Sequence, residues 1–110
     1  MASRYQVVLA QAAQDDLVSI WDYVAARDGH PRADDVLARL QSGCRRLQRL
    51  PRRGHPPPEL QHLGFTGFLE LSESPFRIVY EIRERKVPVH AILDGRRDLQ
   101  DLLLQRLLLR

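Results

Sequence analysis

The stretch Phe76-Arg77-Ile78-Val79-Tyr80-Glu81-Ile82 decides the fold, because its side chains alternate in character. Residues 76, 78, 80 and 82 are apolar or aromatic and fall on one face of an extended strand, whereas Arg77, Val79 and Glu81 fall on the other. A charged turn at 83–86 and the apolar segment Val87–Leu93 follow directly. The sequence therefore predicts a β-hairpin, which is the strongest local signal in the chain.

Two helices are predicted upstream of this hairpin, after an opening strand at Arg4–Leu9. Their apolar residues recur at spacings of three and four, as on one side of a helix. These residues are Ala13, Leu17, Ile20, Trp21 and Val24 in the first helix, and Leu37, Leu40, Cys44, Leu47 and Leu50 in the second. Asp28-Gly29 ends the first helix, Pro31 suits the first turn of the second, and Pro51 ends it. The very short connection predicts an antiparallel helical hairpin that buries both stripes.

The remaining segments complete the predicted order. Residues 51–67, rich in proline and glycine, are expected to form a loop, and Phe68–Leu71 a short strand. Asp98 is a reasonable N-cap for a closing helix at roughly 99–109, which holds seven leucines. Three of them, Leu99, Leu103 and Leu107, share one face. The others wrap around the helix, so it is expected to bury more than one face or to meet a partner.

The order β-α-α-β-β-β-α predicts a fold of the α+β class. We expect the helical hairpin to pack on one face of a mainly antiparallel, four-stranded sheet. A chain of 110 residues has room for one modest core, so residues 1–110 are interpreted as a single domain.

Composition narrows the functional classes. The chain is 44% hydrophobic and 28% charged, as in globular proteins. No apolar run approaches the ~20 residues of a membrane span, and the amino terminus lacks the pattern of a secretory signal. Cys44 is the only cysteine, and His30, His55 and His62 lack metal-ligand spacing, so we expect neither a metal nor another cofactor. These features predict a cytoplasmic protein, with Cys44 as a small core residue.

The positive charge is unevenly distributed along the chain. Residues 1–44 carry four arginines against six aspartates, whereas residues 45–110 carry thirteen basic against eight acidic residues. A basic half suggests an acidic partner, either a nucleic acid or an acidic protein segment. The run Arg45, Arg46, Arg49, Arg52 and Arg53 admits two interpretations, a phosphate-facing patch or the solvated face of a helix, and the second is favoured.

Several short motifs follow one another along nearly the whole chain. They are Tyr5-Gln6-Val7 with Asp16-Leu17, Ile20 and Tyr23-Val24; Leu50-Pro51 with Gly54 and Pro58-Glu59-Leu60; Phe76-Arg77-Ile78-Val79-Tyr80; and Ile92-Leu93-Asp94-Gly95-Arg96-Arg97-Asp98. In this order and at these spacings they resemble the ParE/RelE superfamily of toxins, and most closely its ParE branch.

The resemblance implies a protein partner. Members of the superfamily are usually encoded beside an antitoxin, ParD-like in this branch, whose flexible segment wraps the toxin and blocks it. Segments that fold on binding cover large surfaces. A groove along Leu17, Trp21 and Val24 is the candidate antitoxin site, although Trp21 is more simply read as a core residue. A homodimer is also expected.

The superfamily offers two mechanisms, and site chemistry rather than fold has to separate them. ParE-like toxins bind and poison DNA gyrase, whereas RelE-like toxins cleave mRNA on the ribosome. By resemblance, Arg77 and Arg97 match two arginines of the nuclease, but its lysine positions hold Phe68 and Glu70 and its tyrosine position holds Leu103. A leucine cannot transfer a proton. The gyrase-poison reading is therefore preferred, with ribosome-dependent mRNA cleavage as the alternative and an inactive antitoxin-binding homologue as a third reading.

Candidate residues follow from each mechanism. A gyrase poison would contact its target through Arg96, Arg97 and Arg77, with the exposed side of the closing helix. A nuclease would use Arg77 and Arg97 on the phosphate. His90 is the one histidine on a predicted strand, so it would serve as acid or base, although a partly exposed structural role is the commoner outcome. The two arginines have a structural reading too, as ion-pair partners of Glu70, Glu81 or Asp98.

Overall fold

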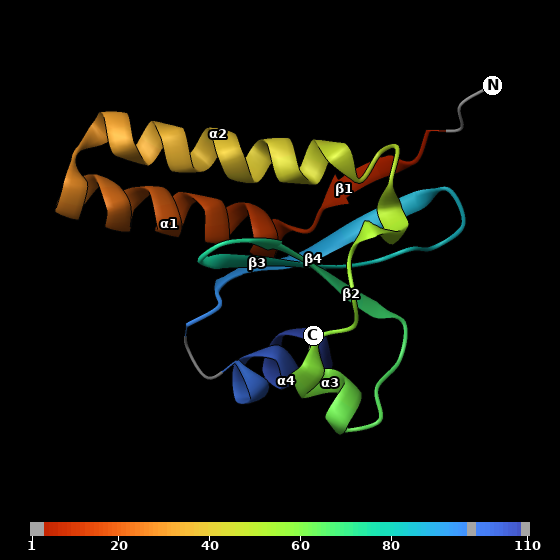
Figure 1. Ribbon diagram of the computed structural model, residues 1–110. Coiled ribbons are helices and arrows are strands. Elements are labelled where there is room, and N and C mark those ends of the chain that lie inside the picture. The colour runs from red at the N-terminus through yellow and green to blue at the C-terminus, as the bar shows by residue number, and fades with distance from the viewer. Residues whose placement is uncertain (1–3, 97–98, 109–110) are drawn as a thin grey trace.

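The computed structural model describes residues 4–96 and 99–108 and has the expected order of elements, with two short helices added (Figure 1). The elements are β1 (Gln6–Leu9), α1 (Gln11–Asp28), α2 (His30–Arg46), the 3₁₀ helix η1 (Pro51–Arg53), α3 (Pro58–His62), β2 (Phe68–Glu73), β3 (Phe76–Glu81), β4 (Lys86–Asp94) and α4 (Gln100–Leu108). The strands form one sheet in the order β1-β4-β3-β2, in which β1 runs parallel to β4 and the other pairs are antiparallel.

Helices cover both faces of this sheet. The hairpin α1–α2 lies on one face, and α3 and α4 lie together on the opposite face (Figure 1). The predicted α+β class and hairpin-on-sheet packing are confirmed, and the closing helix α4 packs on the second face of the sheet. Within the described part of the chain, no helix is long and apolar enough to cross a membrane.

The helical hairpin forms where the stripes predicted it. Gly29, with φ +91°, turns the chain between α1 and α2 in a conformation that a side chain would strain, and Pro31 stands in the first turn of α2. The stripes meet the sheet in one core, together with Ile78, Tyr80 and Val89. Leu50 was wrongly assigned to the second stripe: α2 ends at Arg46 and a turn follows, so Leu50 leaves the helical register and is exposed.

The alternation in β3 is confirmed. Phe76, Ile78 and Tyr80 are buried in the core beneath the hairpin, whereas Val79 belongs to the core on the other face. The pairing of β3 with β4 shifts between Val79 and Tyr80, whose partners are Ala91 and Val89. His90 therefore stands as the extra residue of a β-bulge.

The segment 51–67 was predicted as a loop and instead contains η1 and α3. Pro51 and Pro58 each stand in the first turn of a short helix, where a missing N–H is tolerated. The Tyr80 hydroxyl donates to the Pro51 carbonyl at 2.7 Å and accepts from the Gly54 N–H at 3.1 Å. A Cβ at Gly54 would lie 2.5 Å from that hydroxyl and from the Glu70 carbonyl oxygen, so only glycine fits against β2 here.

The second core lies under the closing helix. Leu99, Leu103 and Leu107 are buried on one side of this segment, as predicted, against apolar residues of the sheet and of α3. Those residues are Leu60, Val79, Ala91 and Leu93. The proposed N-cap Asp98 and the candidate Arg97 lie outside the described residues.

Candidate functional site

Arg77 lies at the centre of a nearly buried cluster of charges on the second face of the sheet. Its guanidinium donates to both carboxylate oxygens of Glu59, at 2.6 and 2.7 Å, and its Nε donates to Glu70 Oε1 at 2.7 Å. Only 14% of the Arg77 side chain and 7% of the Glu70 side chain are exposed. All three guanidinium nitrogens therefore already serve carboxylates, two of them in the forked geometry that suits arginine.

The protonation of this cluster follows from its geometry. The hydrogen bonds that Arg77 donates to Glu59 raise the pKa of Arg77 above its ordinary value, and the same bonds hold the pKa of Glu59 below its usual range. The His55 ring also approaches Glu70, with Nε2 3.6 Å from Oε2. The structural reading of Arg77 foresaw Glu70 as a partner but missed Glu59, which α3 carries to the site.

His90 is buried, contrary to the expected partly exposed position. Its Nε2 lies 2.6 Å from Glu81 Oε1, and its ring meets the Phe68 ring edge-on at 5.9 Å. Glu81 also accepts from Arg83 at 2.7 Å. The bulge in β4 explains the difference, because an extra residue re-aims the side chains around it.

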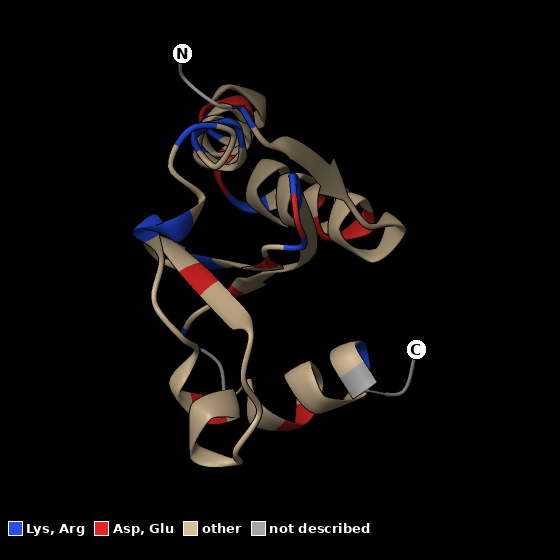
Figure 2. Ribbon diagram, turned by 90° about the vertical axis from the view of Figure 1, so that its right-hand side faces the viewer, with Lys and Arg blue, Asp and Glu red and all other residues tan. Residues whose placement is uncertain are grey.

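Among the described residues, the positions where the resemblance places nuclease residues do not form an open acid–base site. Glu70 is tied to Arg77, and Leu103 is fully buried in the second core. Phe68 is half-buried and packs against that core. The arginines of the run 45–53 are all exposed, and the segments that carry them gather at the end of α2 and in η1 (Figure 2).

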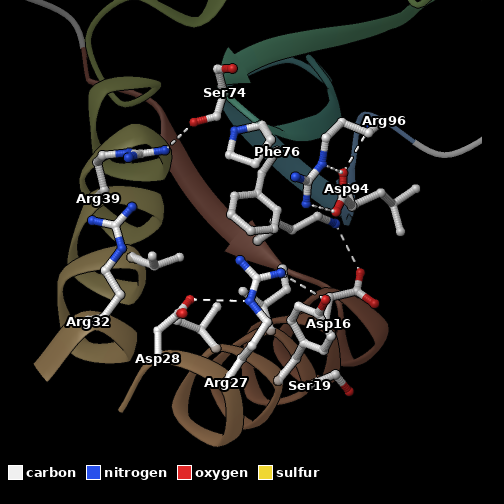
Figure 3. Close-up of a pocket in the computed structure, with 17 residues that line it drawn as sticks. Asp16, Ser19, Arg27, Asp28, Arg32, Arg39, Ser74, Phe76, Asp94 and Arg96 are labelled. Atoms are coloured by element: carbon white, nitrogen blue, oxygen red, sulfur yellow. Dashed lines mark hydrogen bonds and ion pairs between the residues drawn. The ribbon is translucent and has the colours of Figure 1, made fainter. Parts of the chain in front are cut away.

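A cleft of about 840 Å³ opens between the helical hairpin and the ends of β3 and β4. Four arginines lie around it: Arg27 from α1, Arg32 and Arg39 from α2, and Arg96 from the segment after β4 (Figure 3). Its apolar lining comes from α1, α2 and the strands and comprises Ile20, Val24, Val36, Phe76, Ile92 and Leu93. Of the two candidate target contacts that the structure describes, Arg96 lines this cleft and Arg77 does not.

The cleft arginines differ in how far their charge is already engaged. Arg96 donates to both carboxylate oxygens of Asp94, at 3.0 and 2.7 Å, and Arg27 lies 3.5 Å from Asp28. Arg39 donates to the Ser74 carbonyl and lies 3.8 Å from Glu73. For Arg32 the described residues provide neither a hydrogen bond nor an ion pair, and its side chain is exposed.

Asp16 lies in the wall of the cleft and accepts hydrogen bonds from two other elements. Its carboxylate accepts the Ile92 N–H at 2.9 Å and a forked pair of bonds from Arg106 at 2.9 and 3.0 Å. β1 ends at Leu9, opposite Val89, so this bond satisfies an N–H on the unpaired edge of β4. One carboxylate thus connects α1, β4 and α4.

A second, apolar groove lies on the other side of α1. It measures about 580 Å³ and is lined by Leu9, Gln14, Leu17, Val18, Trp21, Leu37 and Gln41. Trp21 donates its ring N–H to Asp34 at 2.9 Å and packs against the His30 ring at 5.0 Å. Of the three candidate antitoxin residues, Leu17 and Trp21 therefore line one groove, whereas Val24 lines the cleft.

Sequence reasoning missed the cleft. Arg27, Arg32 and Arg39 are three of the four arginines in an otherwise acidic stretch, residues 1–44, and this isolation was the one available signal. The run at 45–53 drew attention instead. Among the described residues no group of three or more histidine, cysteine, aspartate or glutamate side chains could hold a metal ion.

Comparison with known proteins places the chain among toxins. A family model described as the ParE toxin of the type II toxin–antitoxin system, parDE, matches residues 7–99. The chromosomal ParDE toxin–antitoxin system from P. aeruginosa contains a similar chain, with a TM-score of 0.69 and 17% identity over 81% of this chain and 94% of that one. The toxin–antitoxin complex RelBE2 from Mycobacterium tuberculosis contains another, with a TM-score of 0.61 and 22% identity over 86% and 94% of the two chains. The chain matches no curated protein.

Proposed function

Because this chain belongs to the family of ParE toxins of type II toxin–antitoxin systems, we propose that it inhibits DNA gyrase by binding and is neutralised by a cognate ParD-like antitoxin. The family model describes a toxin, and it matches most of the chain, residues 7–99. The choice of gyrase over the ribosome rests on the chemistry of the site. The proposed site of action is the cytoplasm.

The state of Arg77 is the observation that carries this choice. RNA cleavage needs cations that face the phosphate as its negative charge develops. The Arg77 guanidinium instead donates its hydrogen bonds to Glu59 and Glu70, and these carboxylates would repel a phosphate. This arrangement supports a binding protein over a nuclease of the RelE type.

The proton-transfer groups point the same way. A general acid or base has to reach the proton that it moves, directly or through one water. His90 is buried against Glu81, and Leu103 occupies the position of the nuclease tyrosine inside the second core. Neither of these two side chains combines a titratable group with access to a large RNA substrate.

Arg96 is the proposed contact with gyrase. Its side chain is 63% exposed, at the end of β4, and its bonds to Asp94 are those of a surface pair that a partner can displace at little cost. Arg97, the next residue in the sequence, is proposed as a second contact with gyrase and lies outside the described residues. Arg77 is a poorer candidate, because a target would have to break its buried contacts.

An apolar segment of the antitoxin is proposed to occupy the groove beside α1. Leu17 and Trp21 line it, and Val18 presents a large exposed hydrophobic side chain at its edge. Amphipathic helices commonly bind in such grooves through apolar anchors. Val24 faces the opposite side of α1, so it would meet only a segment that also enters the cleft.

The proposal is tested by DNA supercoiling with purified gyrase, relaxed plasmid and increasing amounts of this protein. We expect supercoiling to be lost, cleaved DNA to accumulate, and equimolar antitoxin to reverse both effects. Arg96→Ala should weaken the inhibition by about tenfold, as for loss of a charged interface contact. Arg52→Ala, an exposed arginine of η1, is the matched control and should inhibit like the original protein.

A parallel translation reaction separates the alternative mechanism. If gyrase keeps its activity while mRNA is cut during translation, the protein is a ribosome-dependent nuclease and the proposal is wrong. If neither reaction responds and growth is unaffected by expression without antitoxin, the chain is an inactive homologue.

A further inference from the structure

The cleft collects positive charge from parts of the chain that are otherwise acidic. Residues 1–44 have a net charge of −2, yet three of their four arginines, Arg27, Arg32 and Arg39, line this one hollow. Arg96, in the segment after β4, also lines the cleft. Folding therefore brings four cations that the sequence keeps apart to the lining of one cleft, and neighbouring like charges are unfavourable without a counter-charge.

The cleft's own carboxylates do not fully supply that counter-charge. Arg77 and Arg106, elsewhere in the molecule, each form forked bonds to a carboxylate with little exposure. In the cleft, Arg96 and Arg27 pair with Asp94 and Asp28 only at the exposed surface. Arg39 donates to carbonyl oxygens and lies 3.8 Å from Glu73, and Arg32 has no polar partner among the described residues. Guanidinium groups in such settings keep donors available for an incoming carboxylate.

The walls of the cleft suit a protein surface. Tyr23 lies at its rim with 59% of its surface exposed, and the Arg27 guanidinium lies 5.4 Å from the centre of its ring and donates to its hydroxyl at 3.0 Å. Tyrosine and arginine are the residues that most often dominate binding at protein interfaces. Phe76 and Val36 add an apolar floor.

The same lining argues against a polyphosphate chain as the occupant. Asp16, Asp28 and Asp94 line the cleft together with the arginines, so a continuous row of phosphates would meet negative charge as well as positive (Figure 3). A peptide that spaces single carboxylates between apolar side chains matches both the mixed charges and the apolar floor. The favoured ligand is therefore an acidic, partly apolar peptide segment.

We infer that this cleft binds an acidic segment of the antitoxin and that the bound segment covers Arg96. The inference rests on the proposed function for the identity of the partner. The cleft and the apolar groove flank the same helix, α1, so one antitoxin chain that crosses α1 reaches both. Neutralisation then follows by occlusion, because the bound carboxylates occupy the surface that carries the proposed gyrase contact.

The test measures binding of the purified cognate antitoxin by titration calorimetry, with no gyrase present. We expect Arg32→Glu to weaken binding by about tenfold or more, as for charge reversal at an interface, and Arg32→Gln to weaken it less. Raising the salt from 50 to 300 mM should weaken binding by the original protein more than binding by Arg32→Glu. Arg53→Glu, an exposed arginine outside the cleft, is the control and should bind normally.

The outcomes separate the two proposals. If the original protein binds the antitoxin and Arg32→Glu binds equally well at every salt concentration, the cleft inference is wrong while the proposed function stands. If the original protein binds no antitoxin, the proposed partner itself is wrong.

A short DNA duplex that displaces the antitoxin from the original protein but binds Arg32→Glu weakly would assign the cleft to nucleic acid and overturn the inference. Arg32 forms no hydrogen bond or ion pair with the described residues, so misfolding is not expected, and circular dichroism of each variant checks this.

Discussion

At the scale of single residues, the arginines of this protein differ in role through their surroundings. Arg77 forms forked bonds to Glu59 inside a nearly buried cluster, whereas Arg32 stands at the surface of a cleft. The first arrangement joins elements of the fold, and the second leaves donors for a partner. A guanidinium that stabilises structure and one that recognises a ligand therefore cannot be told apart by residue type.

Replacing Arg77 tests its structural role. Arg77→Ala leaves the carboxylates of Glu59 and Glu70 together without their cation, and breaking such a buried pair lowers the free energy of unfolding by about 3 kcal/mol. Urea denaturation measures the change. Arg83→Ala, which loses an exposed pair with Glu81, should stay within about 0.5 kcal/mol. Equal effects of the two substitutions would contradict the buried role.

The lowered pKa of Glu59 predicts a specific pH dependence. Because this pKa is lower in the folded than in the unfolded chain, the Glu59 contribution is complete above the unfolded value near 4.5 and is lost as the pH falls through the folded value. The protein should therefore lose stability between about pH 5 and pH 3, and Glu59→Gln should lose less over the same range. Thermal unfolding at several pH values measures both, and parallel curves would rule out this linkage.

At the scale of elements, α4 completes the second layer of the molecule. Its leucines cover Val79 and Ala91 on the face that the hairpin leaves open, and Arg106 ties it to Asp16 of α1. Hydrogen bonds to Asp16 raise the pKa of Arg106, as expected for a stabilised ion pair. The leucine-rich end of the chain is therefore part of the core of this fold.

Truncation of one leucine measures how much this layer contributes. Leu103 is fully buried, so Leu103→Ala removes apolar contacts, leaves a cavity and lowers the free energy of unfolding by about 3 kcal/mol. Leu63→Ala, at a 40% exposed position after α3, is the matched control and should change it by less than about 1 kcal/mol. A change near zero for Leu103→Ala would mean that α4 is not docked on the sheet in solution.

At the scale of the whole molecule, the two cores share one sheet. Ile78 and Tyr80 belong to the core under the hairpin, and Val79 between them belongs to the core under α4. Loss of either core therefore exposes the same strand, and the two layers should unfold together.

Coincident unfolding tests this coupling. Trp21 fluorescence reports on the hairpin, while far-ultraviolet circular dichroism reports on all the helices and strands. Both signals should follow one transition, and Leu103→Ala should shift the midpoint of the fluorescence transition although Trp21 lies on the opposite side of the sheet. A fluorescence midpoint that does not move would show that the layers unfold independently.

Features with a local period were readable from the sequence. The alternation from Phe76 to Ile82 and the stripes of the first two helices follow from the geometry of a single element, and so does the face shared by Leu99, Leu103 and Leu107. The resemblance to the toxin superfamily rested on short motifs spread from Tyr5 to Asp98. The helices η1 and α3 escaped prediction because a helix of one turn has too few residues to display a period.

Local patterns in the sequence thus specify the class of fold, the order of its main elements and the face that each buries. The roles of the charged residues depend instead on how the elements pack. Glu59 meets Arg77 because α3 folds against the sheet, and the four arginines meet in one cleft because α1, α2 and β4 converge there. The physical reason is that periodicity specifies a direction within one element, whereas an ion pair or a cleft depends on the distances between elements, which packing alone sets.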